Sequence, residues 1–242
     1  MRKTIFTAIL VASLCACSHT KDASEQTDLK PAEIYTLGQK ALEEKDYKKS
    51  AELFSKITYE FPYYSGVSKA HIMEIYSYYM QGDYDNVVFS AENYVKTYPM
   101  SNQIAYVYYM KALAFYEQIG LPYRDHSMAT DAKAAFQEVA SRFTSSRYAK
   151  DAEIKIKMIN NHLASHEMII GRYYLNKGEV LSAIGRFKDV ISSYADSAQV
   201  EEALYRLAEA YNFLGMKTEA KKHITQLAKK YPHSTWNRAA AK

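Results

Sequence analysis

Residues 46–62 read DYKKSAELFSKITYEFP, and 37 positions later residues 83–99 read DYDNVVFSAENYVKTYP. Both stretches begin with Asp-Tyr and end with an aromatic residue followed by proline. Near the C-terminus the same shift brings Gly178 onto Gly215. A fixed period of this length is typical of stacked two-helix units, because each unit repeats one helix–turn–helix and buries its apolar face against its neighbours. The sequence therefore predicts an array of helix pairs.

Small and large residues recur at matching positions of these units. A small residue in the first helix lets two helix backbones approach closely, and a large side chain in the second helix fills the remaining space. Glycine favours the turn that stops one helix, and proline ends the next because it has no amide hydrogen to donate. The small residues are Gly38, Ala112, Gly171 and Ala208, and their expected partners are Phe54, Phe136, Phe187 and Ile224.

The unit resembles the tetratricopeptide repeat, which is about 34 residues long. This resemblance implies an all-α fold, a superhelical array with a long concave surface. The chain has 242 residues but eight Gly and five Pro, too few for the many turns of an all-β sandwich or barrel. Five units are predicted, over residues 31–64, 67–100, 103–144, 147–195 and 201–234.

Two features interrupt the regular period. The third unit is split by a long connection from Gly120 to Ser127 (GLPYRDHS). The fourth opens with a stretch from Arg147 to Lys177 that lacks proline, so a single helix of about 31 residues is predicted there, about 45 Å long. That helix would divide the array into an N-terminal half, residues 31–146, and a C-terminal half, residues 147–236, followed by a tail, residues 237–242.

The first residues have the features of an export signal. Two basic residues precede an apolar stretch, Ile5–Leu14, which is too short to cross a bilayer. Leu14-Cys15-Ala16-Cys17 resembles a bacterial lipobox, with Cys17 as the lipid acceptor. An ordinary signal peptide that carries two cysteines is the alternative. We predict a cleaved signal peptide over residues 1–16 and a lipidated, flexible tether over residues 17–30, because the tether is polar.

Charge and export together limit the partners. The formal net charge is +4, and cleavage of the signal peptide removes Arg2 and Lys3, which leaves +2. A charge this small gives little support for a nucleic-acid partner, which requires a clustered basic face. Ser18, in place of Asp after the lipid acceptor, resembles lipoproteins that are sent on to the outer membrane. The expected location is therefore the periplasmic face of the outer membrane, with a lipid anchor.

Tyrosine is the unusual residue of this chain, with 23 copies. Side chains three or four apart share one face of a helix, so several tyrosines and a lysine are expected on the inner face of the first three units. Such a stripe suits an extended peptide with an aromatic side chain and a free carboxylate. The alternative is that the stripe belongs to the core. The predicted peptide-binding residues are Tyr35, Lys69, Tyr76, Tyr79, Tyr106, Tyr109 and Tyr116.

Enzyme motifs are scarce. The chain has no phosphate-binding glycine loop, no GxSxG and no HExxH. His162 and His166 are four residues apart and, with Glu167, form the one arrangement that resembles a metal site. Two histidines without a convincing third ligand are more often a solvated helix face. We predict no catalytic residue, no metal and no cofactor, although a metal hydrolase at these residues is an alternative that elemental analysis would test.

Several longer stretches, together with the lipobox, the tether and the split third unit, resemble the BamD family of lipoproteins from the bacterial β-barrel assembly machinery. The resemblance covers residues 17 to about 236. The stretches are Ala32-Glu33-Ile34-Tyr35, Glu60-Phe61-Pro62, Ile75-Tyr76-Ser77-Tyr78-Tyr79, Tyr106–Leu113 and Glu167–Tyr174.

The resemblance implies a non-catalytic scaffold with two binding halves. Its N-terminal repeats would recognise the C-terminal signals of unfolded outer-membrane proteins. Its C-terminal repeats would contact the POTRA domains of the barrel subunit and small companion lipoproteins, with Arg186 at the POTRA interface. A lipoprotein adaptor for peptidoglycan enzymes or proteases is the alternative, and it would share every feature except the partners.

Overall fold

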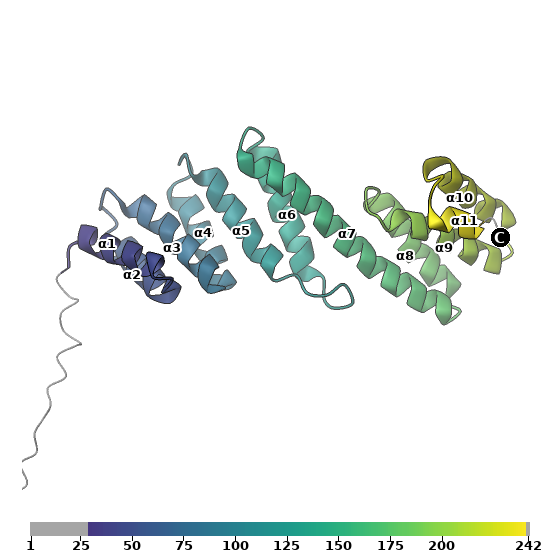
Figure 1. The fold of residues 1–242 in the computed structure, drawn as a ribbon, viewed down its shortest axis with the longest axis horizontal. Coiled ribbons are helices and arrows are strands. Elements are labelled where there is room, and N and C mark those ends of the chain that lie inside the picture. The colour runs from purple at the N-terminus through teal and green to yellow at the C-terminus, as the bar shows by residue number, and fades with distance from the viewer. Residues whose placement is uncertain (1–28, 241–242) are drawn as a thin grey trace, which may run out of the picture.

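The computed structural model describes residues 29–240, which form eleven α-helices and no strand (Figure 1). The first six helices are α1 (Pro31–Glu43), α2 (Tyr47–Glu60), α3 (Val67–Gln81), α4 (Tyr84–Thr97), α5 (Ile104–Glu117) and α6 (Ser127–Arg142). The other five are α7 (Arg147–Asn176), α8 (Val180–Ser193), α9 (Val200–Phe213), α10 (Lys217–Lys230) and α11 (Thr235–Ala240).

The helices form a row of five antiparallel pairs, each packed on the next, from α1–α2 at one end to α9–α10 at the other (Figure 1). The predicted all-α array of five tetratricopeptide-like units is confirmed. The long helix is also confirmed, because α7 runs for 30 residues without interruption. The structure adds a short helix after the five pairs, α11, which packs against α9 and α10. It spans the end of the predicted C-terminal half and most of the predicted tail.

A left-handed glycine marks the turn within three of the five pairs. Gly82 ends α3 in the left-handed conformation, with φ of 79°, which favours glycine because it has no Cβ. Asp83 then caps α4, and its carboxylate accepts a hydrogen bond from the amide of Asn86 at 3.3 Å. Gly178 and Gly215 have the same conformation two and three pairs further along. The 37-residue period therefore reflects, in part, a recurring turn in which a left-handed glycine ends the first helix of a pair.

Glycine also allows close contact inside the pairs. A Cβ built on Gly38 would lie 2.9 Å from Cζ of Phe54, and one on Gly171 would lie 2.5 Å from Cε1 of Phe187. Both phenylalanines are fully buried. The predicted pairing of small and large residues is therefore seen at both sites, where the ring of the second helix rests on the backbone of the first.

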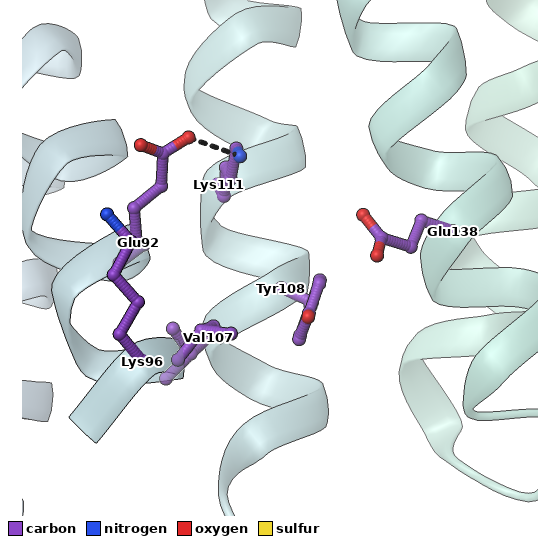
Figure 2. Close-up of a pocket in the computed structure, with 8 residues that line it drawn as sticks. Glu92, Lys96, Val107, Tyr108, Lys111 and Glu138 are labelled. Atoms are coloured by element: carbon purple, nitrogen blue, oxygen red, sulfur yellow. Dashed lines mark hydrogen bonds and ion pairs between the residues drawn. The ribbon is translucent and has the colours of Figure 1, made fainter. Parts of the chain in front are cut away.

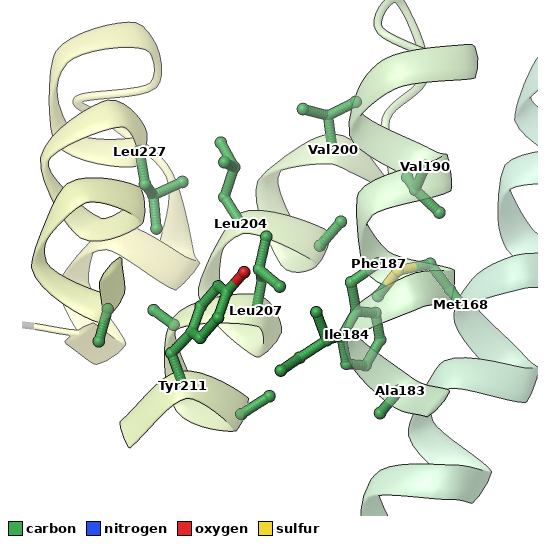
Figure 3. Close-up of a cluster of buried hydrophobic side chains, with 14 of the residues drawn as sticks. Met168, Ala183, Ile184, Phe187, Val190, Val200, Leu204, Leu207, Tyr211 and Leu227 are labelled. Atoms are coloured by element: carbon green, nitrogen blue, oxygen red, sulfur yellow. The ribbon is translucent and has the colours of Figure 1, made fainter. Parts of the chain in front are cut away.

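The buried side chains form a chain of clusters instead of a single core. The largest, which we call the C-terminal cluster, joins α7, α8, α9 and α10 around Phe187, Leu204 and Leu207 (Figure 3). α7 contributes Met168 to this cluster and Ile159 to the preceding cluster with α5 and α6. The long helix is therefore the element that links the two halves of the array.

The described chain begins slightly before the first predicted unit, since Leu29 packs against the cluster formed by α1 and α2. The predicted signal peptide, Cys17 and the tether up to residue 28 lie outside the described residues. Within residues 29–240, none of the helices has both the length and the apolar character needed to cross a bilayer.

Candidate peptide-binding groove

The first helices of the second, third and fourth pairs meet around an open cavity of about 370 Å³. α3 is adjacent to α5, and α5 is adjacent to α7, so their side chains reach a common space. The cavity is lined by Ile72, Met73 and Tyr76 from α3, Gln103 and Tyr106 from the start of α5, and Arg147 and Tyr148 from the start of α7. It therefore combines apolar, aromatic and cationic groups.

Tyr106 and Tyr148 line this cavity side by side, and Tyr109 packs against Tyr148 outside the lining. The ring of Tyr148 lies 5.7 Å from that of Tyr106 and 5.1 Å from that of Tyr109, measured between centroids. Tyr109 also makes an edge contact of 5.9 Å with the buried ring of Phe136. Ring contacts at these distances are favourable, so they help to position Tyr106 and Tyr148 at the cavity.

Two tyrosine hydroxyl groups near the cavity, those of Tyr79 and Tyr109, donate hydrogen bonds to carboxylates. Tyr109 donates to the carboxylate of Asp151 at 2.5 Å, and Tyr79 donates to that of Glu117 at 3.1 Å. Burial, followed by the hydrogen bond to Glu117, raises the pKa of Tyr79 to about 12. Burial likewise raises the pKa of Tyr106 and of Tyr109 above the ordinary range. These phenols therefore remain neutral at physiological pH.

Arg147 supplies the positive charge at the cavity. It is the first residue of α7, and its guanidinium donates to the hydroxyl of Tyr148 at 2.9 Å while lying 4.9 Å from the centre of that ring. A guanidinium held in this way keeps further N–H groups for a carboxylate. Lys69, the predicted cation, lies exposed on α3 and is not among the residues that line the cavity.

The other predicted tyrosines lie further away. Tyr35 packs on Phe54 in the first pair, with ring centroids 5.4 Å apart. Tyr116 lies at the opposite end of α5 from Tyr106, beneath Lys155, whose Nζ is 4.6 Å from the ring centre. It lines a second open cavity of about 340 Å³ with Met158 and His162. The predicted stripe is therefore divided into a central group, Tyr76, Tyr79, Tyr106 and Tyr109, and two outlying members.

Sequence reasoning missed Arg147, Tyr148, Met73 and Gln103. Arg147 and Tyr148 begin the next unit, and the stacking of α7 on α5 brings them to the cavity. The available signal was the inner-face rule itself, which would have reached them if it had been extended by one unit to the first turn of the long helix.

A third cavity, of about 200 Å³, lies between α4, α5 and α6 (Figure 2). Lys111 donates to Glu92 across it at 2.6 Å, and this contact lowers the pKa of Glu92. Glu138 on the far side is paired with Arg142 at 2.6 Å. Because these charged groups are already paired within the chain, the cavity offers less to a charged ligand than the one at Arg147.

His166 and Glu167, two of the three residues considered as metal ligands, have other partners, and His162 lines the open cavity beside Tyr116. His166 Nδ1 lies 2.5 Å from the carbonyl oxygen of Pro122, and its ring lies 4.6 Å from that of His126. Glu167 accepts a hydrogen bond from Arg186 at 2.9 Å. Within residues 29–240, no group of three His, Cys, Asp or Glu side chains is arranged to hold a metal ion. The contacts of His126 and His166 instead fasten the long connection before α6 to α7.

Arg186, the predicted partner-binding residue, joins α8 to α7 through its ion pair with Glu167. Its side chain is 39% exposed, whereas that of Glu167 is 14% exposed. The ion pair with Glu167 raises the pKa of the guanidinium. The structure thus places Arg186 at the surface of the C-terminal half, with part of its hydrogen-bonding capacity already used.

Comparison with known proteins gives matches over nearly the whole chain. The family YfiO, described as "Outer membrane lipoprotein", matches residues 27–227. "Outer membrane protein assembly factor BamD" from Rickettsia prowazekii (strain Madrid E) is 38% identical over 234 residues, which are 96% of this chain and 93% of the relative. The protein of the same name from Caulobacter vibrioides is 33% identical over 235 residues, 96% of this chain and 77% of the relative.

Among solved structures, a crystal structure of MamA aligns with 83% of this chain and 91% of its own, at a TM-score of 0.37 and 18% identity. The sequence matches are far closer and extend across both halves of the helical array. This chain belongs to the YfiO family of outer membrane lipoproteins, the family of the BamD assembly factors.

Proposed function

We propose that this protein is a non-catalytic scaffold for the assembly of β-barrel proteins in the outer membrane, anchored at the periplasmic face through a lipid on Cys17. The names of its relatives support the assembly role. We further propose that the cavity between α3, α5 and α7 binds the C-terminal end of unfolded barrel proteins, a strand that ends in an aromatic residue.

The single observation that carries the binding site is the position of Arg147 beside Tyr76, Tyr106 and Tyr148 around one cavity. A terminal aromatic residue presents a ring and a carboxylate only a few bonds apart. The tyrosines offer rigid aromatic contact for the ring, and Arg147 offers paired N–H donors for the carboxylate. This arrangement assigns to Arg147 the role that the sequence analysis gave to Lys69.

The test is a binding titration with a peptide that ends in phenylalanine, as the free acid and as the C-terminal amide. We expect Tyr76→Ala to weaken both peptides about tenfold through loss of aromatic contact. Arg147→Gln should weaken the free acid about tenfold or more and leave the amide nearly unchanged, because the amide carries no charge for Arg147 to bind.

Lys69→Gln is the matched control, since it removes a cation from the neighbouring surface of α3, outside the cavity lining. It should change neither affinity by more than about twofold. Equal loss of the acid and the amide on Arg147→Gln would contradict the carboxylate assignment. Loss on Lys69→Gln alone would return the role to lysine.

For the C-terminal half we propose docking on the POTRA domains of the barrel subunit, with companion small lipoproteins nearby and Arg186 at the interface. Partial exposure of Arg186 at the α7–α8 surface supports this role. In detergent extracts, Arg186→Ala should reduce co-purification of a POTRA-containing barrel protein. Arg172→Ala, which breaks a comparable ion pair with Glu202 at 3.0 Å, is the control for loss of local structure. Recovery of peptidoglycan enzymes or proteases in place of the barrel subunit would favour an adaptor role instead.

A further inference from the structure

The last helices of the array carry a charge that the rest lacks. Residues 217–240 hold six Lys or Arg residues and one acidic residue, whereas residues 29–216 hold 21 basic and 23 acidic residues. Most of the excess lies in α10, which has five exposed lysines and no arginine. Because Ala220 and Leu227 face the C-terminal cluster, the lysines cover the outer surface at the end of the row.

Exposed apolar side chains gather at one edge beside these lysines. The turn between α9 and α10 exposes Phe213 (74%), Leu214 (39%) and Met216 (46%). Leu181 (75%) lies in the first turn of α8, which antiparallel packing against α9 brings to the same edge. Large apolar side chains are common singly on protein surfaces, but four at one edge next to Lys217 point to an interaction surface.

We propose that this end of the molecule, the outer face of α10 with the α9–α10 turn, is a contact surface for the anionic phospholipid headgroups of the membrane. Clusters of lysine are attracted to anionic lipid, and apolar side chains between them enter the boundary between headgroups and acyl chains. The chain belongs to a family of outer membrane lipoproteins, so a bilayer is close at hand.

The choice of cation favours lipid over an acidic protein surface. Protein interfaces are enriched in arginine and depleted in lysine, because the planar guanidinium makes specific paired contacts at a lower cost in side-chain ordering. The outer face of α10 instead carries flexible point charges, and Lys222 makes a long contact of 3.8 Å with Glu219. Such charges suit a fluid array of phosphates that offers no fixed partner.

This inference rests on the membrane location and not on client binding. Helix α1, which follows the predicted tether in the sequence, lies at one end of the row, and α10 lies at the other end (Figure 1). A protein held at both ends would lie along the bilayer. Loss of the basic surface on α10 would leave peptide binding in the titration unchanged. Failure of this proposal can therefore be told apart from failure of the proposed function.

The test is flotation of residues 18–242, which contain every described helix but neither the leader nor Cys17, with vesicles of defined lipid. We expect binding to vesicles of phosphatidylethanolamine and phosphatidylglycerol, and much weaker binding to phosphatidylcholine alone. Raising salt from about 50 to about 300 mM should reduce the binding, because screening weakens attraction to the surface. Lys221→Gln with Lys229→Gln should weaken it about 25-fold, or about fivefold for each lysine. Phe213→Ser should weaken it about tenfold.

Matched controls are available at the opposite end. Lys48→Gln with Lys49→Gln removes two exposed lysines from α2, and Tyr63→Ser removes a fully exposed ring, so neither should change vesicle binding. Thermal unfolding followed by circular dichroism checks that every variant is folded. Equal binding by the α10 and α2 variants would overturn the proposal. Absence of a preference for phosphatidylglycerol would also overturn it, as would α10 variants that lose a protein partner while retaining vesicle binding.

Discussion

Glu74 and His71 are two titratable residues that the second helix pair buries, one turn apart on α3. Glu74 is 3% exposed and accepts a hydrogen bond from the hydroxyl of Thr58 at 3.0 Å. Burial raises the pKa of this carboxyl from 4.5 to about 7. Burial lowers the pKa of His71 from 6.5 to about 4. Burial in the folded protein therefore favours the neutral form of both side chains.

The two residues give stability opposite dependences on pH. Between about pH 4.5 and 7 the folded state keeps the proton of Glu74 that the unfolded state releases, so the free energy of unfolding falls as pH rises. Between about pH 4 and 6.5 the unfolded state takes up a proton on His71 that the folded state refuses, so the free energy of unfolding rises with pH. In the native chain these effects largely cancel.

Replacing Glu74 by glutamine should reveal this balance. The free energy of unfolding of Glu74→Gln, relative to the native chain, should increase by about 3 kcal/mol between pH 4 and pH 8, because only the native chain must ionise a buried carboxyl. Urea unfolding at several pH values measures the difference. Glu43→Gln on the exposed face of α1 is the control, and a Glu74→Gln difference that stays constant with pH would refute the prediction.

The helix pairs themselves are set by contacts that the sequence shows well. The turn glycines, the terminal prolines and the 37-residue period predict the five helix pairs and the long helix that begins at Arg147, because these signals act through the local backbone. α11 was not predicted. It has six residues, lies beyond the last repeat and is held by the contact of Trp236 with Tyr205, with centroids 5.3 Å apart. Tertiary packing of this kind leaves no periodic signal.

The difference between local sequence signals and tertiary packing also separates the predicted residues of the groove from the missed ones. Tyr76 and Tyr106 follow from helical spacing, which the sequence shows directly. Arg147 and Tyr148 depend on how α7 stacks on α5, and the irregular connection before α6 breaks the period there. Only the three-dimensional packing could therefore show that Arg147, and not Lys69, lines the cavity.

The α7–α8 pair offers a test of the close glycine contact. Gly171→Ala should lower the free energy of unfolding by about 1 to 3 kcal/mol, because the new Cβ would overlap the ring of Phe187. Gly185→Ala, on the exposed side of α8, should raise it by about 0.5 to 1 kcal/mol, because nothing lies within 4 Å of its Cβ and alanine favours helix. Urea unfolding measures both. Changes of the same sign would contradict the packing at Gly171.

Over the whole molecule, a row of local clusters should unfold with only nearest-neighbour coupling. The single tryptophan, Trp236, reports on the C-terminal cluster, against which it packs. Phe54→Ala leaves a cavity at a buried site in the first pair and should cost about 3 to 5 kcal/mol of local stability. It should lower the midpoint temperature of unfolding seen by circular dichroism and leave the midpoint seen by tryptophan fluorescence unchanged.

Leu207→Ala in the C-terminal cluster should have the reverse effect and shift the tryptophan midpoint to lower temperature. Both variants are followed by thermal unfolding with the two signals recorded together. If Phe54→Ala moved the tryptophan transition as far as Leu207→Ala does, the array would be a single cooperative unit.

Helix α7 also acts as a lever. It begins at Arg147, beside the cavity, and its later turns carry Glu167 and Arg172, which hold α8 and α9 by ion pairs. Because a regular helix of this length is about 45 Å long, a tilt of about 5° at its start displaces its far end by about 4 Å. If the helix moves as one rod, a displacement at Arg147 would be carried to α8 and α9 through these ion pairs, without a hinge between them.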